Sequence, residues 1–352
     1  MDTDTSSPTH DSAPTSTPWP QVVATVALLT VIISVLLTAF AWPAVRSSAH
    51  DVPIVLAGPP TATDRIAAAL QQRQPGAFDI TRAADTAAAE TAVRNREAYG
   101  AIDVSTGTPQ VIIASAGSPV IAQTLQSIAA GLAQAPGGAP ATPAVAVRDV
   151  AALPADDPRG AGLAAGSLPL VMGGILAAVL LTGRVRGTTR RLTGALAFAV
   201  SGGLALAAIL QFWFGSITGN YGANAGVIAL SIAATALTLL GLQTLLGTAG
   251  LGLGAVVVML IGNPLSGTGT APEMLPGWSG QLGQLLPPGA AGTLLRSTAF
   301  FDGRGATQPL IVLLSWLVLG AVLCVIGGVR AARTGGTGPS GTTAGPEPAT
   351  AA

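Results

Sequence analysis

Long runs of uncharged apolar residues constrain this chain more than any other feature. The first run, QVVATVALLTVIISVLLTAFA at 21–41, contains no charged side chain. Roughly 20 such residues cross the hydrocarbon core of a bilayer as a helix. Of the 352 residues, 49% are hydrophobic and 9% are charged, whereas an ordinary soluble domain has about 25% charged residues. The sequence therefore predicts an α-helical integral membrane protein.

Six transmembrane helices are predicted. The first, 21–43, is interpreted as an uncleaved anchor, because the run is long and no arginine precedes it. The alternative is a cleaved signal peptide, since AFA at 39–41 fits a cleavage site. The glycine-rich stretch 247–254 is interpreted as a turn before the fifth helix. The other five predicted helices lie at about 167–183, 193–214, 227–247, 251–264 and 309–329.

Residues 44–165, between the first two helices, have the pattern of a small α/β domain. Strand-like apolar runs alternate with segments of helical spacing. At about 120 residues, such a segment can bury a core of its own. The expected strands are 52–58, 77–83, 99–105, 109–116 and 144–150, and the expected helices are 62–74, 85–97 and 119–134.

The remaining segments are two tails and a five-helix body. Residues 1–20 and 331–352 are rich in small and polar residues, so we expect disordered cytoplasmic tails. The body, 166–330, contains an outer loop at 265–307 with two apolar segments too short to span. We expect shallow or re-entrant outer helices there, the alternative being an ordinary extracellular loop. This outer re-entrant region is defined by Asn263, Pro264, Trp278 and Arg296.

Arginine placement predicts the orientation of the chain. Arginine in short loops marks the cytoplasmic side of a membrane. Arg330 and Arg333 follow the last predicted helix, whereas Arg46 follows the first and argues the other way. We therefore expect a multi-pass plasma-membrane protein with both termini cytoplasmic and the α/β domain outside. Four further arginines lie between the second and third helices, where they would dock a cytoplasmic partner: Arg184, Arg186, Arg190 and Arg191.

The stretch PADDPRGAG (154–162) stands at the threshold of the second predicted helix. Asp156 and Asp157 could form a catalytic pair or a solvated turn, but neighbours in an extended segment point apart. Asp157 does not easily precede Pro158 in a helix, and Arg159 can pair with either acid or with lipid phosphate. The stretch is interpreted as a charged joint between the outer domain and the membrane.

Several chemistries are excluded or disfavoured by composition. All sixteen basic residues are arginine, so neither a P-loop lysine nor a Schiff-base lysine exists. Cys324 is the one cysteine, and His10 and His50 are the only histidines. We therefore expect neither enzymatic activity nor a metal or cofactor. The net charge of zero argues against nucleic acid. Because no ionisable residue lies well inside a predicted span, a proton-coupled antiporter is disfavoured.

The layout is similar to that of the ABC-2-type permease superfamily, and in particular of YhgE/Pip-like membrane proteins. The specific features are GNPLSG…LPGW…LLPPGAAGTLLRSTAFF over 262–301 and the DDPRG stretch. The resemblance implies a dimeric permease half with short outer helices, driven by a separate ATPase subunit that docks on cytoplasmic loops. The amphipathic helix that usually precedes the first span in that superfamily is missing here. The bias toward Ala, Gly and Arg is typical of an actinobacterial, high-GC genome.

Two functions are therefore weighed. The first is a permease-like subunit, without its own ATPase, that exports a lipid-like substrate through the lipid bilayer. The second is a non-transporting scaffold or receptor whose outer domain binds a cell-envelope partner. A nearby ATPase subunit would favour the first, and capture of an envelope partner by residues 47–160 would favour the second.

Overall fold

A computed structural model describes residues 17–133 and 145–335. Five of its helices are long and apolar enough to cross a membrane, which supports the prediction of a membrane-embedded helical protein. They are α1 (Trp19–Val45), α5 (Ala161–Arg184), α6 (Thr188–Ala208) with its π-helical continuation η1 (Ile209–Trp213), α7 (Tyr221–Leu246) and α11 (Thr307–Gly335).

The predicted fifth span is shorter than the others. It consists of α8 (Thr248–Val256) and the π-helix η2 (Val257–Gly262). At about 1.5 Å per residue this helix is about 22 Å long, less than the hydrocarbon core of about 30 Å. Pro264 follows closely, and a proline does not continue a helix. Within the described ranges there are thus five helices of spanning length and one shorter apolar helix, rather than six full spans.

The turn predicted over 247–254 is wrong. Gly247, with a φ of 69°, makes the turn, and α8 begins at the next residue. The other glycines belong to the helix and let it approach α7. A Cβ atom on Gly250 would lie 2.3 Å from the carbonyl oxygen of Leu242, which no ordinary side chain tolerates. The closely spaced glycines look like a loop in the sequence, but in the structure they allow α8 to pack closely against α7.

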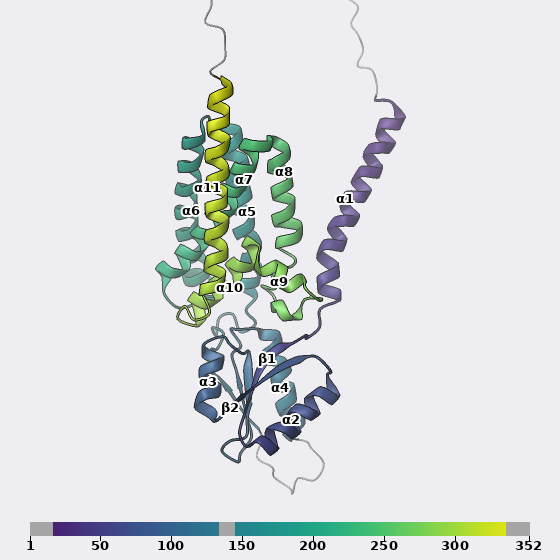
Figure 1. Ribbon diagram of the computed structural model, residues 1–352, viewed down its shortest axis with the longest axis vertical. Helices are drawn as coiled ribbons and strands as arrows, with labels where there is room; N and C mark the ends of the chain where they lie inside the picture. Colours follow the sequence, from purple (N-terminus) through teal and green to yellow (C-terminus); the bar gives the residue numbers. More distant parts are fainter. Residues whose placement is uncertain (1–16, 134–144, 336–352) are drawn as a thin grey trace, which may run out of the picture.

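Helix α7 is the centre of the membrane body. It packs against α5, α6, α8, α10 and α11, and 78% of its apolar window is buried. Ile228, Ile232, Leu239 and Leu240 are almost completely buried along its length. In contrast, no residue in the apolar window of α1 is buried, and this helix leans away from the bundle (Figure 1). The body is therefore organised around α7, with α1 at its edge.

The α/β domain is a five-stranded sheet with the strand order β2-β1-β3-β4-β5. Neighbouring strands are parallel except β3 and β4, which are antiparallel. The elements agree with the expected ones to within a few residues, and the whole stretch 135–143 between the expected helix 119–134 and strand 144–150 lies outside the described residues. They are β1 (Val52–Ala57), α2 (Pro60–Arg73), β2 (Phe78–Ala83), α3 (Thr86–Arg94), β3 (Gly100–Asp103), β4 (Gln110–Ile113), α4 (Pro119–Ala133) and β5 (Ala146–Asp149).

Element boundaries differ from the expected domain limits at three places. Helix α11 runs to Gly335 and so includes 331–335 of the tail expected over 331–352. Trp19 and Pro20 begin α1 rather than ending the tail, because a proline is well accommodated in the first turn of a helix. Helix α5 begins at Ala161, within the segment expected to belong to the α/β domain. That domain is called the outer domain below, after the side of the membrane on which it is expected. Residues 1–16 and 336–352 of the expected tails lie outside the described ranges.

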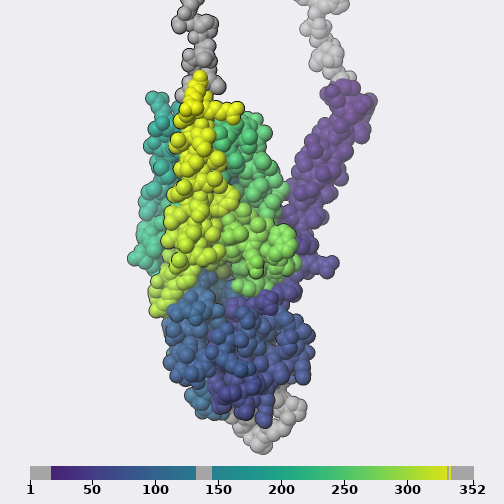
Figure 2. All heavy atoms as spheres, in the orientation of Figure 1, coloured from purple at the N-terminus to yellow at the C-terminus, as the bar shows by residue number. Residues whose placement is uncertain are grey.

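The outer domain sits directly against one end of the membrane body (Figure 2). The start of α1 and the end of α11 both lie at the opposite end, apart from each other because α1 leans away (Figure 1). Three short helices belong to the segment between η2 and α11: η3 (Pro272–Met274), α9 (Ser279–Gln284) and α10 (Pro287–Phe300). Short helices are therefore present where they were expected, and most residues of α10 are buried because it packs against α7 and α11.

Candidate functional site: a cavity between the outer domain and the membrane body

A cavity of about 520 Å³ lies where the outer domain meets the segment that connects η2 to α11. Residues around the α3–β3 connection form one wall, and residues of η3, α9 and α10 form the other. Four of the lining side chains are titratable: Arg96, Tyr99, Glu273 and Arg296. They come from segments far apart in the sequence, so only the tertiary fold brings them together.

Arg96 fastens the outer domain to α10. Its Nη1 donates hydrogen bonds to the carbonyl oxygen of Thr293 at 2.9 Å and to the hydroxyl of Ser297. Its guanidinium also lies over the ring of Phe301, 5.3 Å from the ring centroid, in a cation–π contact. Arg96 has a φ of 64°, a conformation that is uncommon for residues other than glycine. These contacts hold the residue in that conformation.

Tyr99 and Glu273 form a second link across the junction. The Tyr99 hydroxyl donates to Glu273 Oε2 at 2.7 Å. Burial, together with the charge and hydrogen bond of Glu273, raises the pKa of Tyr99, so the phenol stays neutral. The chain after α1 reinforces this link, because the backbone amides of Ser48 and His50 donate to the carbonyls of Met274 and Glu273 at 3.0 and 3.1 Å.

Arg296 is the least satisfied charged group in the cavity wall. Only 5% of the residue is exposed. Its Nη2 donates to the carbonyl oxygen of Thr268 at 2.8 Å, but its buried Nε has no hydrogen-bond partner within the described structure. Burial, and then the charge of Arg96, lower the pKa of Arg296 to about 10. The guanidinium is therefore still protonated at neutral pH.

The titratable groups of the cavity carry unbalanced positive charge. Two guanidiniums face one carboxylate, and Tyr99 is neutral. Neither cavity arginine forms an ion pair with a described residue, and the pairs Arg82–Asp64 and Arg148–Glu90 both lie elsewhere in the outer domain. Buried charges are normally paired. The arrangement can therefore accept an anion, while the described residues contain no cluster of ligands for a metal.

The PADDPRGAG stretch begins α5 and does not line this cavity. Asp157 is buried, and its two carboxylate oxygens accept from the backbone amides of Ala161 at 2.8 Å and Gly162 at 2.7 Å. Asp156, Pro158 and Arg159 are exposed, and no ion pair joins Arg159 to either acid in the described structure. The N-cap residue of α5 is Gly160, and Asp157 caps the helix from three residues before it by accepting from the first two amides. The expected charged joint did not include this specific role.

The arginines expected to dock a partner have different environments. Arg184, Arg186 and Arg190 are exposed at the α5–α6 turn. Arg191 instead donates to the carbonyl oxygens of Val185 at 2.7 Å and Thr182 at 2.9 Å and to Gln243 Oε1 at 3.1 Å. It therefore ties the turn to α7, and only the other three present free guanidiniums to a partner.

The four residues of the expected outer re-entrant region do not form one site. Trp278 is 70% exposed on the surface. Asn263 and Pro264 follow η2 and line a second cavity of about 360 Å³ next to the outer end of α1. The buried Oδ1 of Asn263 has no hydrogen-bond partner in the described part of the chain. Only Arg296 belongs to the main cavity.

Sequence reasoning missed Arg96, Tyr99 and Glu273. Arg96 lies in the polar stretch RNRE, where an arginine looks like an ordinary surface residue, and Glu273 lies in a loop of mixed composition. The one available signal was Arg296, a single arginine within GTLLRSTAFF. An arginine surrounded by apolar residues is rarely buried without a partner.

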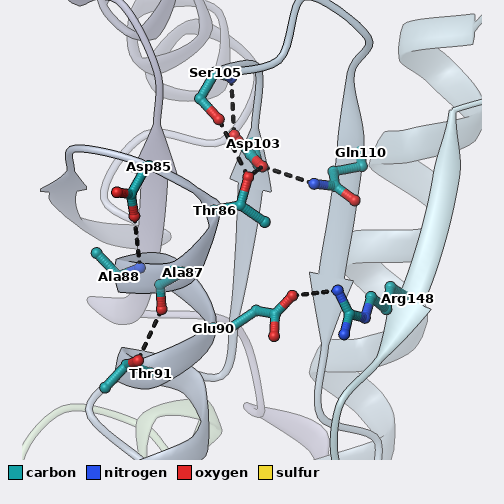
Figure 3. A network of polar contacts seen from close by, with 10 residues as sticks. All are labelled: Asp85, Thr86, Ala87, Ala88, Glu90, Thr91, Asp103, Ser105, Gln110 and Arg148. Atoms are coloured by element: carbon teal, nitrogen blue, oxygen red, sulfur yellow. Dashed lines mark hydrogen bonds and ion pairs between the residues drawn. The ribbon is translucent and has the colours of Figure 1, made fainter.

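A separate polar cluster stabilises the outer domain (Figure 3). Asp103, fully buried at the end of β3, accepts hydrogen bonds from the Thr86 hydroxyl, the Ser105 amide and Gln110 Nε2. Burial alone raises the pKa of Asp103, but the hydrogen bonds together outweigh it and leave the pKa below its usual value. Because its acceptor oxygens are already occupied, Asp103 is a structural group rather than a ligand-binding one.

No family model, curated protein or solved structure matches this chain. Its function is therefore argued from the geometry described above.

Proposed function

We propose that this chain is the permease-like subunit of an export system for an amphiphilic substrate, powered by a separate ATPase subunit and assembled as a dimer in the plasma membrane. The observation that carries the proposal is the cavity shared by the outer domain and the membrane body. In this proposal both termini face the cytoplasm, the short α8–η2 helix completes a sixth passage, and the protein moves its substrate without covalent chemistry.

A continuous path of packed side chains connects the arginine-rich turn to the cavity. Arg191 joins the α5–α6 turn to Gln243 near the end of α7. Helix α7 runs the length of the body and packs against α10, which carries Arg296. Coupling between distant sites travels through such contiguous packed elements. Force applied by an ATPase at the turn would therefore reach the cavity wall through α7.

The second cavity supports an amphiphilic substrate. It lies between the outer end of α1, residues such as Phe40 and Pro43, and the segment 263–275. Thr268 lines it, and the carbonyl oxygen of the same residue accepts from Arg296 of the main cavity. The two hollows are thus neighbours, and α1 has few protein contacts that would keep lipid away. An amphiphile could pass sideways between bilayer and cavity here.

Purification of the full-length chain from its native membranes tests the proposal. An ATPase subunit should co-purify, and the double variant Arg186→Glu/Arg190→Glu should lose it, because both side chains are exposed at the turn. Arg159→Glu, an exposed arginine at the other end of the body, is the matched control and should retain the subunit. Proteoliposomes of the complex should then move a fluorescent lipid analogue only with ATP.

Two results would overturn the proposal. One is purification of the chain without any ATPase. The other is lipid movement that is the same with and without ATP. In either case the scaffold or receptor function becomes the better explanation.

A further inference from the structure

We infer that the main cavity binds the anionic headgroup of its ligand, a tetrahedral oxyanion such as a phosphate, between Arg96 and Arg296. The inference names the ligand chemistry of the proposed transport site and rests on the proposed function for its place in a transport cycle. Binding itself is a property of the cavity and can be measured without transport.

Unused hydrogen-bond donors are the first argument. Only 5% of Arg296 is exposed, and its Nε has no hydrogen-bond partner in the described structure. Among the guanidinium nitrogens of Arg96, only Nη1 donates to a described residue. A guanidinium carries five N–H donors in a planar fork that matches carboxylate and phosphate oxygens. A buried donor without a partner costs free energy, and an oxyanion on the cavity side of the Arg296 guanidinium would offset that cost.

Charge is the second argument. The positive charge of Arg96 lowers the pKa of Arg296, which means that the two guanidiniums repel each other across the cavity wall. Among the described lining residues, Glu273 alone carries a carboxylate, and it lies beyond ion-pair distance of both arginines. An anion between the arginines would relieve this repulsion, whereas a cation would increase it.

The rest of the lining fits a ligand that is only partly polar. Pro53, Val93, Leu285 and Phe301 contribute apolar surface beside the arginines. A volume of about 520 Å³ lies within the usual range of roughly 300–1,000 Å³ for small-molecule pockets. A headgroup with the first part of an acyl or alkyl chain would fill it better than a free ion would.

A purely mechanical role explains Arg96 but does not explain Arg296. Arg96 makes two contacts with α10 and one with Phe301, the residue that follows α10, and so joins the outer domain to this helix. Arg296 lies in α10 and bonds only to the neighbouring Thr268 segment, so it does not cross to the outer domain. A leucine or glutamine would fill its place at a lower desolvation cost. The unpaired charge therefore points to a ligand.

Equilibrium binding to the full-length protein in a neutral detergent tests the inference with three radiolabelled probes. They are dodecyl phosphate, inorganic phosphate and dodecyltrimethylammonium. We expect saturable binding of dodecyl phosphate and none of the cationic amphiphile. Binding of inorganic phosphate with equal affinity would identify a free phosphate as the ligand, and much weaker binding would identify a lipid headgroup. Equal binding of the two amphiphiles, or no binding of either phosphate, would overturn the inference.

Charge variants then locate the site. Arg296→Gln should weaken dodecyl phosphate binding by about tenfold or more, the loss expected for one charge-assisted hydrogen bond. Arg296→Lys, which keeps the charge but not the fork, should lie between this variant and the wild type. Arg94→Gln removes the same charge from an exposed position near the cavity and should bind normally.

The variant Glu273→Gln tests whether misfolding, rather than loss of a ligand contact, explains weaker binding in the arginine variants. Removal of the only carboxylate in the lining should tighten dodecyl phosphate binding several-fold, and a damaged protein would not bind more tightly. Unchanged affinity in both Arg296→Gln and Glu273→Gln would overturn the inference. Intact binding without ATP-dependent transport would instead remove only the proposed function, so the two failures are distinguishable.

Discussion

Replacement of Asp157 by alanine should destabilise the start of α5. The carboxylate accepts hydrogen bonds from the amides of Ala161 and Gly162 and is only 8% exposed, so water cannot easily replace it. Loss of a capping side chain typically costs about 1 kcal/mol and up to about 2. A negative charge at a helix N-terminus adds about 0.3–1 kcal/mol. Because two amides lose their partner at once, we expect a loss of about 2 kcal/mol.

Hydrogen exchange on the full-length protein in detergent measures this loss directly. The amides of residues 161–165 should exchange about 30-fold faster in Asp157→Ala, the factor that corresponds to about 2 kcal/mol. Asp157→Asn, which keeps one acceptor oxygen, should show a smaller increase. Asp156→Ala is the matched control, because its side chain is adjacent but exposed. Equal exchange rates in the alanine variants of Asp156 and Asp157 would refute the capping role.

Three further predictions concern stability. The pKa of Asp103 is lowered in the folded protein. Its contribution to outer-domain stability should therefore be complete above its ordinary pKa of about 3.9 and be lost as the pH falls through the folded value. Asp103→Asn should make the stability less dependent on acidic pH, as measured by hydrogen exchange of the β1 and β3 amides. Arg191→Gln should lower the thermal unfolding temperature measured in detergent, and the exposed Arg190→Gln should leave it unchanged. Gly250→Ala should destabilise the α7–α8 hairpin by about 1–3 kcal/mol, whereas Gly252→Ala, with open space around it, should not; equal effects of the two in the same assay would contradict the close packing.

The helices of spanning length were predictable because length and apolar composition suffice to identify them. The runs that begin near 21, 167, 193, 227 and 309 all became long helices. The fifth predicted span became a helix of similar length that begins earlier, at Thr248 rather than 251, because its glycines conceal where the helix begins. A glycine in a turn and a glycine where two helices touch look the same in a sequence. Only the structure shows that Gly250 lies against the Leu242 carbonyl and is therefore a packing residue rather than a turn residue.

The candidate site was far less predictable than the fold. Arg190 and Arg191 are neighbours in the sequence, yet one is exposed and the other bonds to α7, because successive residues of a helix point in different directions. Asp156 and Asp157 differ in the same way. The cavity unites Arg96 with Arg296, and no local pattern relates residues that are this far apart in the chain.

The two backbone hydrogen bonds from Ser48 and His50 to the η3 segment have a mechanical consequence. Helix α1 has 27 residues and is about 40 Å long at about 1.5 Å per residue, more than the hydrocarbon thickness of about 30 Å. A helix that is too long for its bilayer tilts, and the tilt changes with lipid thickness. Since α1 has little protein around it, its angle is set mainly by the surrounding lipid. A thinner or thicker membrane would change the tilt of α1, and the two hydrogen bonds would pass this movement to the backbone of Glu273. Lipid composition itself would then adjust the width of the main cavity.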